Sequence, residues 1–138
     1  MLAFLNTLQL KQEILKLLEK LNMKKDFKFE PPIQHGEDGV YVYANEWGYN
    51  LTTLERGEII EHSLTRKLFD ILYWSLETTI ISEAATLVSK YSKDSDSYEE
   101  YLLKMSFYKL ELWGRLGINF RKRAEIEVDE IISRNILG

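Results

Sequence analysis

The sequence predicts an α+β fold, in which a small antiparallel β-meander of about three strands packs against a bundle of about four helices. Two observations support this class. Residues 65–91 contain no Gly or Pro and place apolar side chains at steps of three and four, the spacing of one long helix. Residues 40–63 instead alternate between apolar and polar side chains and are interrupted by turn-forming sequences, which is typical of short strands.

The segment 65–91 is predicted to be the central helix around which the other elements pack. Its apolar stripe needs cover from more than one side, and Tyr73 and Trp74 widen it near the start. We expect the pair Tyr73 and Trp74 to be buried, wedged between the meander and the third helix. The stripe comprises Leu68, Ile71, Leu72, Leu76, Ile80, Ala84, Leu87, Val88 and Tyr91.

A first amphipathic helix is predicted to begin after Asn6 and to end near Asn22. Asn6 is a favourable N-cap, and Gln9 stands where it completes a capping box. A connector follows over 24–39, with a short edge strand expected at 27–29 and a turn at 35–39.

The meander is predicted to contain strands at 40–44, 49–54 and 59–63. Glu55-Arg56-Gly57-Glu58 has the composition of a tight hairpin turn, because Gly57 can take a positive φ without strain. Three strands need a covering layer to be stable, and the long helix can supply it.

Two more helices are expected after the long helix. Ser97 and Glu100 have the spacing of a capping box, and Gly117 marks the end of that third helix. Asn119 is the expected cap of the fourth helix, in which Arg121 and Glu125 are spaced for an ion pair.

The composition favours a single cytoplasmic domain over residues 1–138. The chain has no cysteine, no apolar run long enough to span a membrane, and no signal-peptide pattern. Its net charge of −4 is unevenly spread, because residues 31–62 carry six acids against Arg56 alone. That sign is opposite to the one a nucleic-acid-binding region needs, but it suits a basic protein partner.

The sequence offers no catalytic, metal-binding or cofactor-binding constellation. His35 lies beside Glu37 and Asp38, and His62 lies beside Glu61, but neither pair has the spacing of a metal site. No serine sits in a glycine-flanked elbow, and there is no phosphate-binding glycine loop. We therefore expect a protein that is not an enzyme and holds no cofactor.

Aromatic side chains cluster in the meander, at Tyr41, Tyr43, Trp47 and Tyr49, interleaved with its acids. Two interpretations stay open at this point. Tyr and Trp beside charge are common at the centre of protein interfaces, and the same residues can equally form a second face of the core.

Several short sequences in a fixed order resemble the Imm63 family of bacterial immunity proteins, from about residue 40 to the C-terminus. They are Glu55-Arg56-Gly57 between two strands, 70–74 (DILYW), 110–116 (LELWGRL), 120–123 (FRKR) and 127–132 (EVDEII). Two positions differ from the family pattern: Leu102 and Leu103 replace an expected arginine pair, and Lys109 replaces an expected Gln.

The resemblance implies a small cytoplasmic protein, encoded beside a polymorphic toxin, that binds the toxin domain and blocks it. Such a partner is expected to be a basic protein, such as a nuclease, rather than nucleic acid or membrane. The candidate contact residues are Tyr43, Glu46, Trp47, Tyr49, Glu55, Arg56, Glu58 and Glu61. The glutamates would meet basic residues of the toxin, and the aromatics would anchor the contact.

Two alternatives from other classes remain. The aromatics could line a pocket for a small ligand or a substrate, with His35, Glu37 and Asp38 at its mouth. The chain could also be a structural homo-oligomer that uses an apolar face of its first or third helix.

Overall fold

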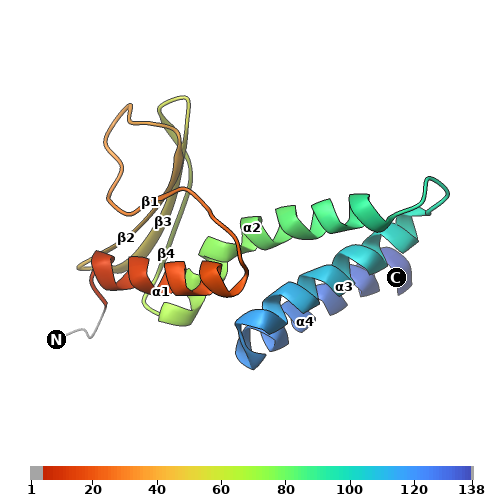
Figure 1. Cartoon of the computed structure of the whole chain (residues 1–138). Coiled ribbons are helices and arrows are strands. Elements are labelled where there is room, and N and C mark those ends of the chain that lie inside the picture. The colour runs from red at the N-terminus through yellow and green to blue at the C-terminus, as the bar shows by residue number, and fades with distance from the viewer. Residues whose placement is uncertain (1–4, 138) are drawn as a thin grey trace. The chain divides into compact units, whose positions relative to one another are not determined.

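The computed structural model describes residues 5–137 and confirms the α+β class. The sheet has four strands where about three were expected, because the short segment at 27–28 also pairs. None of the helices in the described part of the chain has the length and apolar content of a membrane span. The elements are α1 (Thr7–Lys20), β1 (Phe27–Lys28), β2 (Gly39–Asn45), β3 (Gly48–Glu55), β4 (Glu58–Thr65), α2 (Leu68–Tyr91), α3 (Tyr98–Leu116), α4 (Ile118–Ile132) and a π-helical turn, Ser133–Leu137 (Figure 1).

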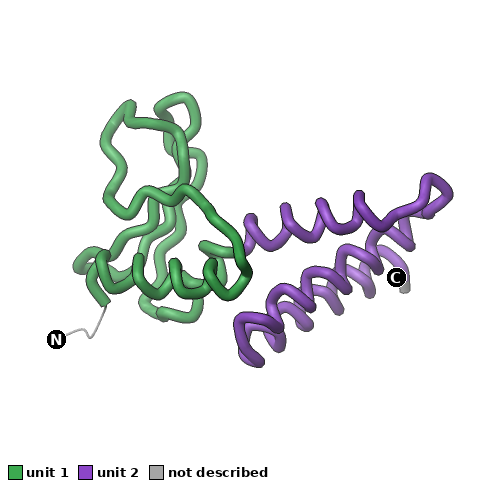
Figure 2. Tube along the Cα trace, in the orientation of Figure 1, with its two compact units in different colours: residues 1–76 green, residues 77–138 purple. Residues whose placement is uncertain are grey.

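The chain forms two compact units, residues 1–76 and 77–138, and the boundary falls inside α2 (Figure 2). The first unit contains α1, the sheet and the start of α2. The second contains the rest of α2 together with α3 and α4. A single domain over the whole chain stays a prediction.

The sheet has the order β1-β2-β3-β4. β1 runs parallel to β2, and the other neighbours are antiparallel. β3 pairs on both sides, and all its residues are buried except Thr53 and Glu55. Among the described residues, β4 pairs on one side only, and none of its residues is fully buried. The sheet therefore has a covered centre and an exposed β4 edge.

Two-residue turns close both hairpins. Arg56 and Gly57 both have positive φ, 55° and 77°, as the mirror-image turn between twisted strands requires. In the turn between β2 and β3, Asn45 Oδ1 accepts a hydrogen bond from Trp47 N at 2.9 Å. Gly48 follows with φ 136°, and a Cβ atom there would lie 2.5 Å from the backbone oxygen of Thr65. The expected role of Gly57 is confirmed.

α1 is held against the sheet by hydrogen bonds at its N-terminus. The capping box of Asn6 and Gln9 is present as expected. Thr7 Oγ1 accepts from Ala44 N at 3.0 Å and donates to Ala44 O at 3.3 Å, and Tyr49 Oη accepts from Leu5 N at 2.9 Å. Tyr49 therefore points towards α1, where Leu10 and Ile14 are fully buried.

Trp74 is only half-buried, whereas its neighbour Tyr73 is 1% exposed. The expectation of a buried Trp74 was therefore wrong in degree. Adjacent helical residues point in directions about 100° apart, so both cannot face the same side. Tyr73 stacks on Phe69 of the same helix, with ring centroids 6.2 Å apart.

In the second unit, Ser97 caps α3 and forms the expected box with Glu100. Asn119 does not cap α4, contrary to expectation, because Gly117 occupies that position with φ 141° and Asn119 lies inside the helix. The tight connection stacks Trp113 on Phe120, with centroids 5.8 Å apart. Arg121 Nε donates to Glu125 Oε1 at 3.2 Å, as the spacing predicted.

Asp96, in the turn before α3, accepts hydrogen bonds from Lys104 Nζ at 2.5 Å and from Lys93 N at 3.1 Å. The bond from Lys104, followed by that from Lys93, lowers the pKa of Asp96 to about 2. In its charged form, the carboxylate of Asp96 therefore links the turn to α3.

Two substitutions in the β3–β4 turn should change the free energy of unfolding in opposite directions. Gly57→Ala places a Cβ at φ 77°, 3.3 Å from His35 Cα, and should destabilise the protein by about 1–2 kcal/mol. Arg56→Asn relieves the strain of a bulky residue at φ 55° and should stabilise it by about 0.5 kcal/mol. Urea unfolding measures both, and equal effects of one sign would contradict the turn assignment.

The Asp96 contact predicts a pH-dependent contribution to stability. A depressed pKa in the folded state stabilises the protein fully above the unfolded value near 4, and this contribution is lost progressively as pH falls through about 2. Asp96→Asn should therefore lower the urea midpoint at pH 7 and have a much smaller effect near pH 2. An equal loss at both pH values would show that the charge is unimportant.

Candidate protein-binding surface

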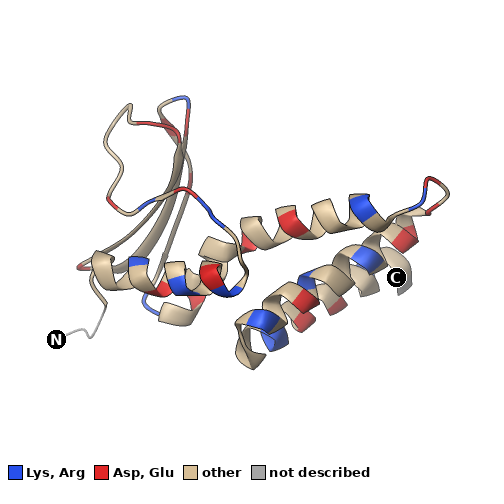
Figure 3. Ribbon diagram, viewed as in Figure 1, with Lys and Arg blue, Asp and Glu red and all other residues tan. Residues whose placement is uncertain are grey.

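Exposed carboxylates gather along the β3–β4 hairpin. Glu55 and Glu58 flank its turn, and Glu61 lies further along β4, opposite Thr53 (Figure 3). Asp38 Oδ1 accepts from Gly57 N at 3.4 Å, which brings a further acid to the same end of the sheet. Within the described residues, no ion pair neutralises the three glutamates. Arg56 at the tip is the hairpin's only Lys or Arg.

Large apolar side chains are exposed on the same strand. Ile59 is 62% exposed, Ile60 59% and Leu64 49%. Ile59 lies opposite Leu54 and Glu61 opposite Thr53, so Ile60 is an extra residue with no opposite partner, that is, a β-bulge. We call the six side chains that share this strand and its turn the acidic edge: Glu55, Glu58, Ile59, Ile60, Glu61 and Leu64.

The apolar side chains of the acidic edge were not among the contact residues predicted from the sequence. The signal was the pair Ile59-Ile60, because consecutive strand residues point to opposite faces and both cannot enter one core. Monomeric proteins expose single apolar residues freely, but a contiguous group on one strand is a common mark of an interaction site.

A cleft of about 430 Å³ adjoins the acidic edge. It lies between the 32–35 segment and the hairpin. Its lining is mostly apolar and includes the carboxylate of Glu58 and the imidazole of His35. Its residues are Pro32, Ile33, Gln34, His35, Leu54, Gly57, Glu58 and Ile59. This is not the pocket expected for a small ligand, because its lining includes none of the meander's aromatics and neither Glu37 nor Asp38.

Glu46 and Trp47 lie at the opposite end of the sheet, in the β2–β3 turn. Both are exposed, Trp47 to 60%. The eight residues of β3 separate this turn from the β3–β4 turn, a distance of roughly 24 Å at about 3.4 Å per residue. Arg66 Nε donates to Trp47 O at 3.4 Å, so this end carries both signs of charge. The predicted contact residues therefore do not form one cluster.

Tyr43 and Tyr49 lie in the core. They are 8% and 2% exposed, and Tyr43 packs with Tyr41 and Leu54 on the sheet face opposite Tyr49. Tyr43 Oη hydrogen bonds with Thr52 Oγ1 at 3.2 Å, and Tyr41 Oη donates to Glu37 O at 2.6 Å. The open question about the aromatics is thus answered differently for the tyrosines, which are core residues, and for Trp47, which is on the surface.

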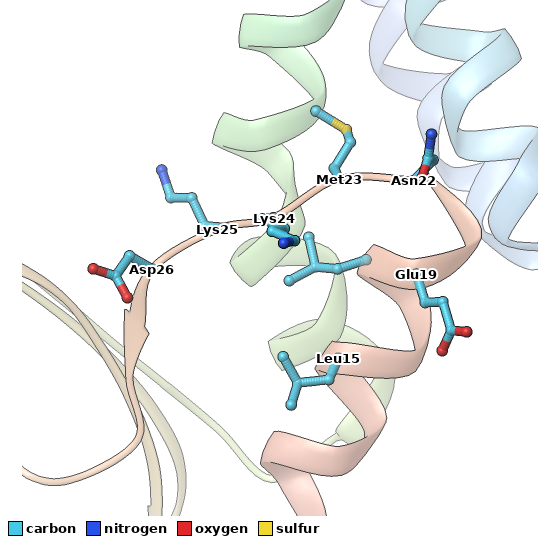
Figure 4. A pocket seen from close by; sticks show the side chains of 8 residues that line it. Leu15, Glu19, Asn22, Met23, Lys24, Lys25 and Asp26 are labelled. Carbon is cyan, nitrogen blue, oxygen red and sulfur yellow. The ribbon is translucent and has the colours of Figure 1, made fainter.

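A second cleft, of about 680 Å³, follows the C-terminal end of α1 (Figure 4). Leu15 and Leu18 supply apolar surface, while both acidic and basic side chains line the rest. The lining is Leu15, Leu18, Glu19, Asn22, Met23, Lys24, Lys25 and Asp26. With two acids and two lysines in close sequence, it has no net charge that would select an ionic ligand.

Neither histidine belongs to a metal site in the described part of the chain, where no group of three or more potential ligands is placed to hold an ion. The Nε2 atom of His62 lies 2.9 Å from Oδ1 of buried Asn50, with which it hydrogen bonds across β3 and β4. His35 has φ 59° in the turn beside Gly57. Both positions are explained by the structure of the sheet and its turns.

Comparison with known families gives a match. The model of the family described as Immunity protein 63 matches residues 45–130, which include β3, β4, α2, α3 and most of α4. No curated protein and no solved structure matches the chain. Because the match covers well over half of the residues and contains the whole β3–β4 hairpin, this chain belongs to the Immunity protein 63 family.

Proposed function

We propose that this protein neutralises a bacterial toxin domain by binding it and covering its active or substrate-binding surface. The match to the immunity family over residues 45–130 carries the proposal. The acidic edge supports it, because exposed carboxylates beside exposed apolar side chains suit a basic protein surface.

The charge of the acidic edge favours a toxin that acts on a phosphate-bearing substrate, such as a nuclease. Such an enzyme presents Lys and Arg to its substrate, and the same groups would meet Glu55, Glu58 and Glu61. Complementary charge also accelerates association, an effect that salt weakens because the Debye length is only about 8 Å at physiological ionic strength.

Trp47 extends the proposed interface to the other end of the sheet. A typical protein interface buries about 800 Å² per partner and is therefore roughly 30 Å across, which is enough to include both turns of β3. An exposed Trp is a frequent source of binding energy, so among the predicted aromatic contact residues Trp47 is the one we propose as an anchor. Tyr43 and Tyr49 are excluded by their burial.

Inhibition of this kind requires no chemistry from the immunity protein. Occlusion needs only a stable fold and a complementary surface, so the proposal makes this chain a non-enzymatic inhibitor without a cofactor. It would act in the cytoplasm, where a toxin of the cell's own or of a neighbour reaches its substrate.

Charge reversal on the acidic edge gives the direct test. Glu55→Lys, Glu58→Lys and Glu61→Lys together should weaken binding to the toxin domain encoded beside this gene by roughly a hundredfold, because each contact becomes repulsive. Co-expression of the two proteins should then no longer rescue bacterial growth.

The matched control makes the same change of charge on the second unit, at exposed Glu111, Asp129 and Glu130. Lys at these positions should leave both affinity and rescue unchanged. Loss of protection in the control alone would place the contact surface on the helices, and failure of the unmodified protein to rescue growth would contradict the proposed function itself.

A further inference from the structure

Among the described residues, no strand pairs with the outer edge of β4, so backbone groups at defined positions of this strand lack a partner strand. In an antiparallel ladder, opposite residues alternate between hydrogen-bonded and non-hydrogen-bonded pairs. Asn45 and Gly48 close a two-residue turn, so they form a hydrogen-bonded pair. Counting along β3 from this pair, the backbone groups of even-numbered residues hydrogen bond to β2 and those of odd-numbered residues hydrogen bond to β4. Ser63 and Thr65 lie opposite Leu51 and Tyr49 and therefore bond to β3. The N–H and C=O groups of His62 and Leu64 point away from the sheet.

From this geometry we infer that the toxin docks by adding an extended strand of its own to the β4 edge over residues 61–65. The inference rests on the proposed function and specifies how the contact is made. Strand addition supplies affinity through backbone hydrogen bonds and specificity through alternate side chains. On β4, Glu61 lies on one face of the sheet and Leu64 on the other, so the two faces of the edge offer a charged and an apolar side chain.

The side chains around β4 define the chemistry of the incoming strand. Lys or Arg side chains would meet Glu58 and Glu61, which have no ion-pair partner among the described residues. Where the partner chain continues past the bulge at Ile60, an apolar side chain would enter the 430 Å³ cleft between Ile33 and Ile59. The partner segment therefore carries both basic and apolar side chains. Basic side chains are the ones that a protein presents to a phosphate-bearing substrate.

A second copy of this chain fits the edge poorly. Two β4 strands would bring glutamates of the same sign to one interface, and like charges across neighbouring strands are destabilising. The bulge at Ile60 also interrupts the regular edge, a feature that limits edge-to-edge association between copies. It leaves the regular stretch from Glu61 to Thr65 free for a short strand from a different protein.

Amide hydrogen exchange, followed by NMR, tests the inference without any substitution. The probe is the purified toxin domain encoded beside this gene, carrying a substitution that inactivates its catalysis. On binding, the amides of His62 and Leu64 should exchange at least about tenfold more slowly. Those of Ser63 and Thr65, already bonded to β3, should change far less. Protection of neither His62 nor Leu64 in a formed complex would overturn the inference.

Two substitutions at one position separate the backbone from the side chain. Leu64→Pro removes the outward N–H, and an edge strand tolerates Pro there because that group faces solvent. It should weaken binding by about tenfold more than Leu64→Ala, which keeps the N–H. Circular dichroism confirms that both variants are folded.

The outcomes distinguish the two proposals. If the unmodified protein does not bind the toxin domain, the proposed function fails. If it binds but Leu64→Pro and Leu64→Ala behave alike and the exchange pattern does not alternate, the toxin uses another surface and strand addition is wrong. A complex that contains two copies of this chain joined through β4 would also overturn the inference.

Discussion

The two-residue turns at both ends of β3 are the constraint on which the rest of the first unit depends. They fix the register of β2 and β4 on either side, so that Leu51 lies opposite both Val42 and Ser63. Both turns need glycine: Gly57 because of its positive φ, and Gly48 because the Thr65 backbone passes so close. With the register fixed, β3 is buried in the centre and β4 is left at the edge.

This arrangement separates the residues that hold the fold from those that face a partner. The tyrosines of β2 and β3 are satisfied by hydrogen bonds inside the unit, to Glu37 O, Thr52 Oγ1 and Leu5 N. Among the described residues, the glutamates of the acidic edge have no comparable internal partners, and the apolar side chains of this edge remain in contact with water. A surface of this kind contributes little to stability, so substitutions there can change its charge and shape while the fold is kept.

Local signals in the sequence were sufficient for the elements but not for burial. The caps at Asn6 and Ser97 and the turn at Gly57 were predictable because each depends on a few neighbouring residues. The aromatics of the meander were expected to share one face, but Tyr43 and Tyr49 lie on opposite faces and both are buried. Alternation within one strand shows neither how neighbouring strands are paired nor that both faces are covered. Gly117 displaced Asn119 as the cap because the tight connection to α4 requires φ 141°. The bulge at Ile60 depends on pairing between strands, which no local pattern reveals.

Inhibition by stoichiometric occlusion, as we propose it for this protein, is tested most directly by a titration of toxin activity. The active toxin domain is held at a concentration well above the expected Kd, and its turnover is measured as this protein is added. Occlusion predicts a linear fall in activity that reaches zero at one molecule of inhibitor per toxin. Complete inactivation by much less than one equivalent would show that the protein acts catalytically, and full activity at an excess would show that it does not bind this toxin.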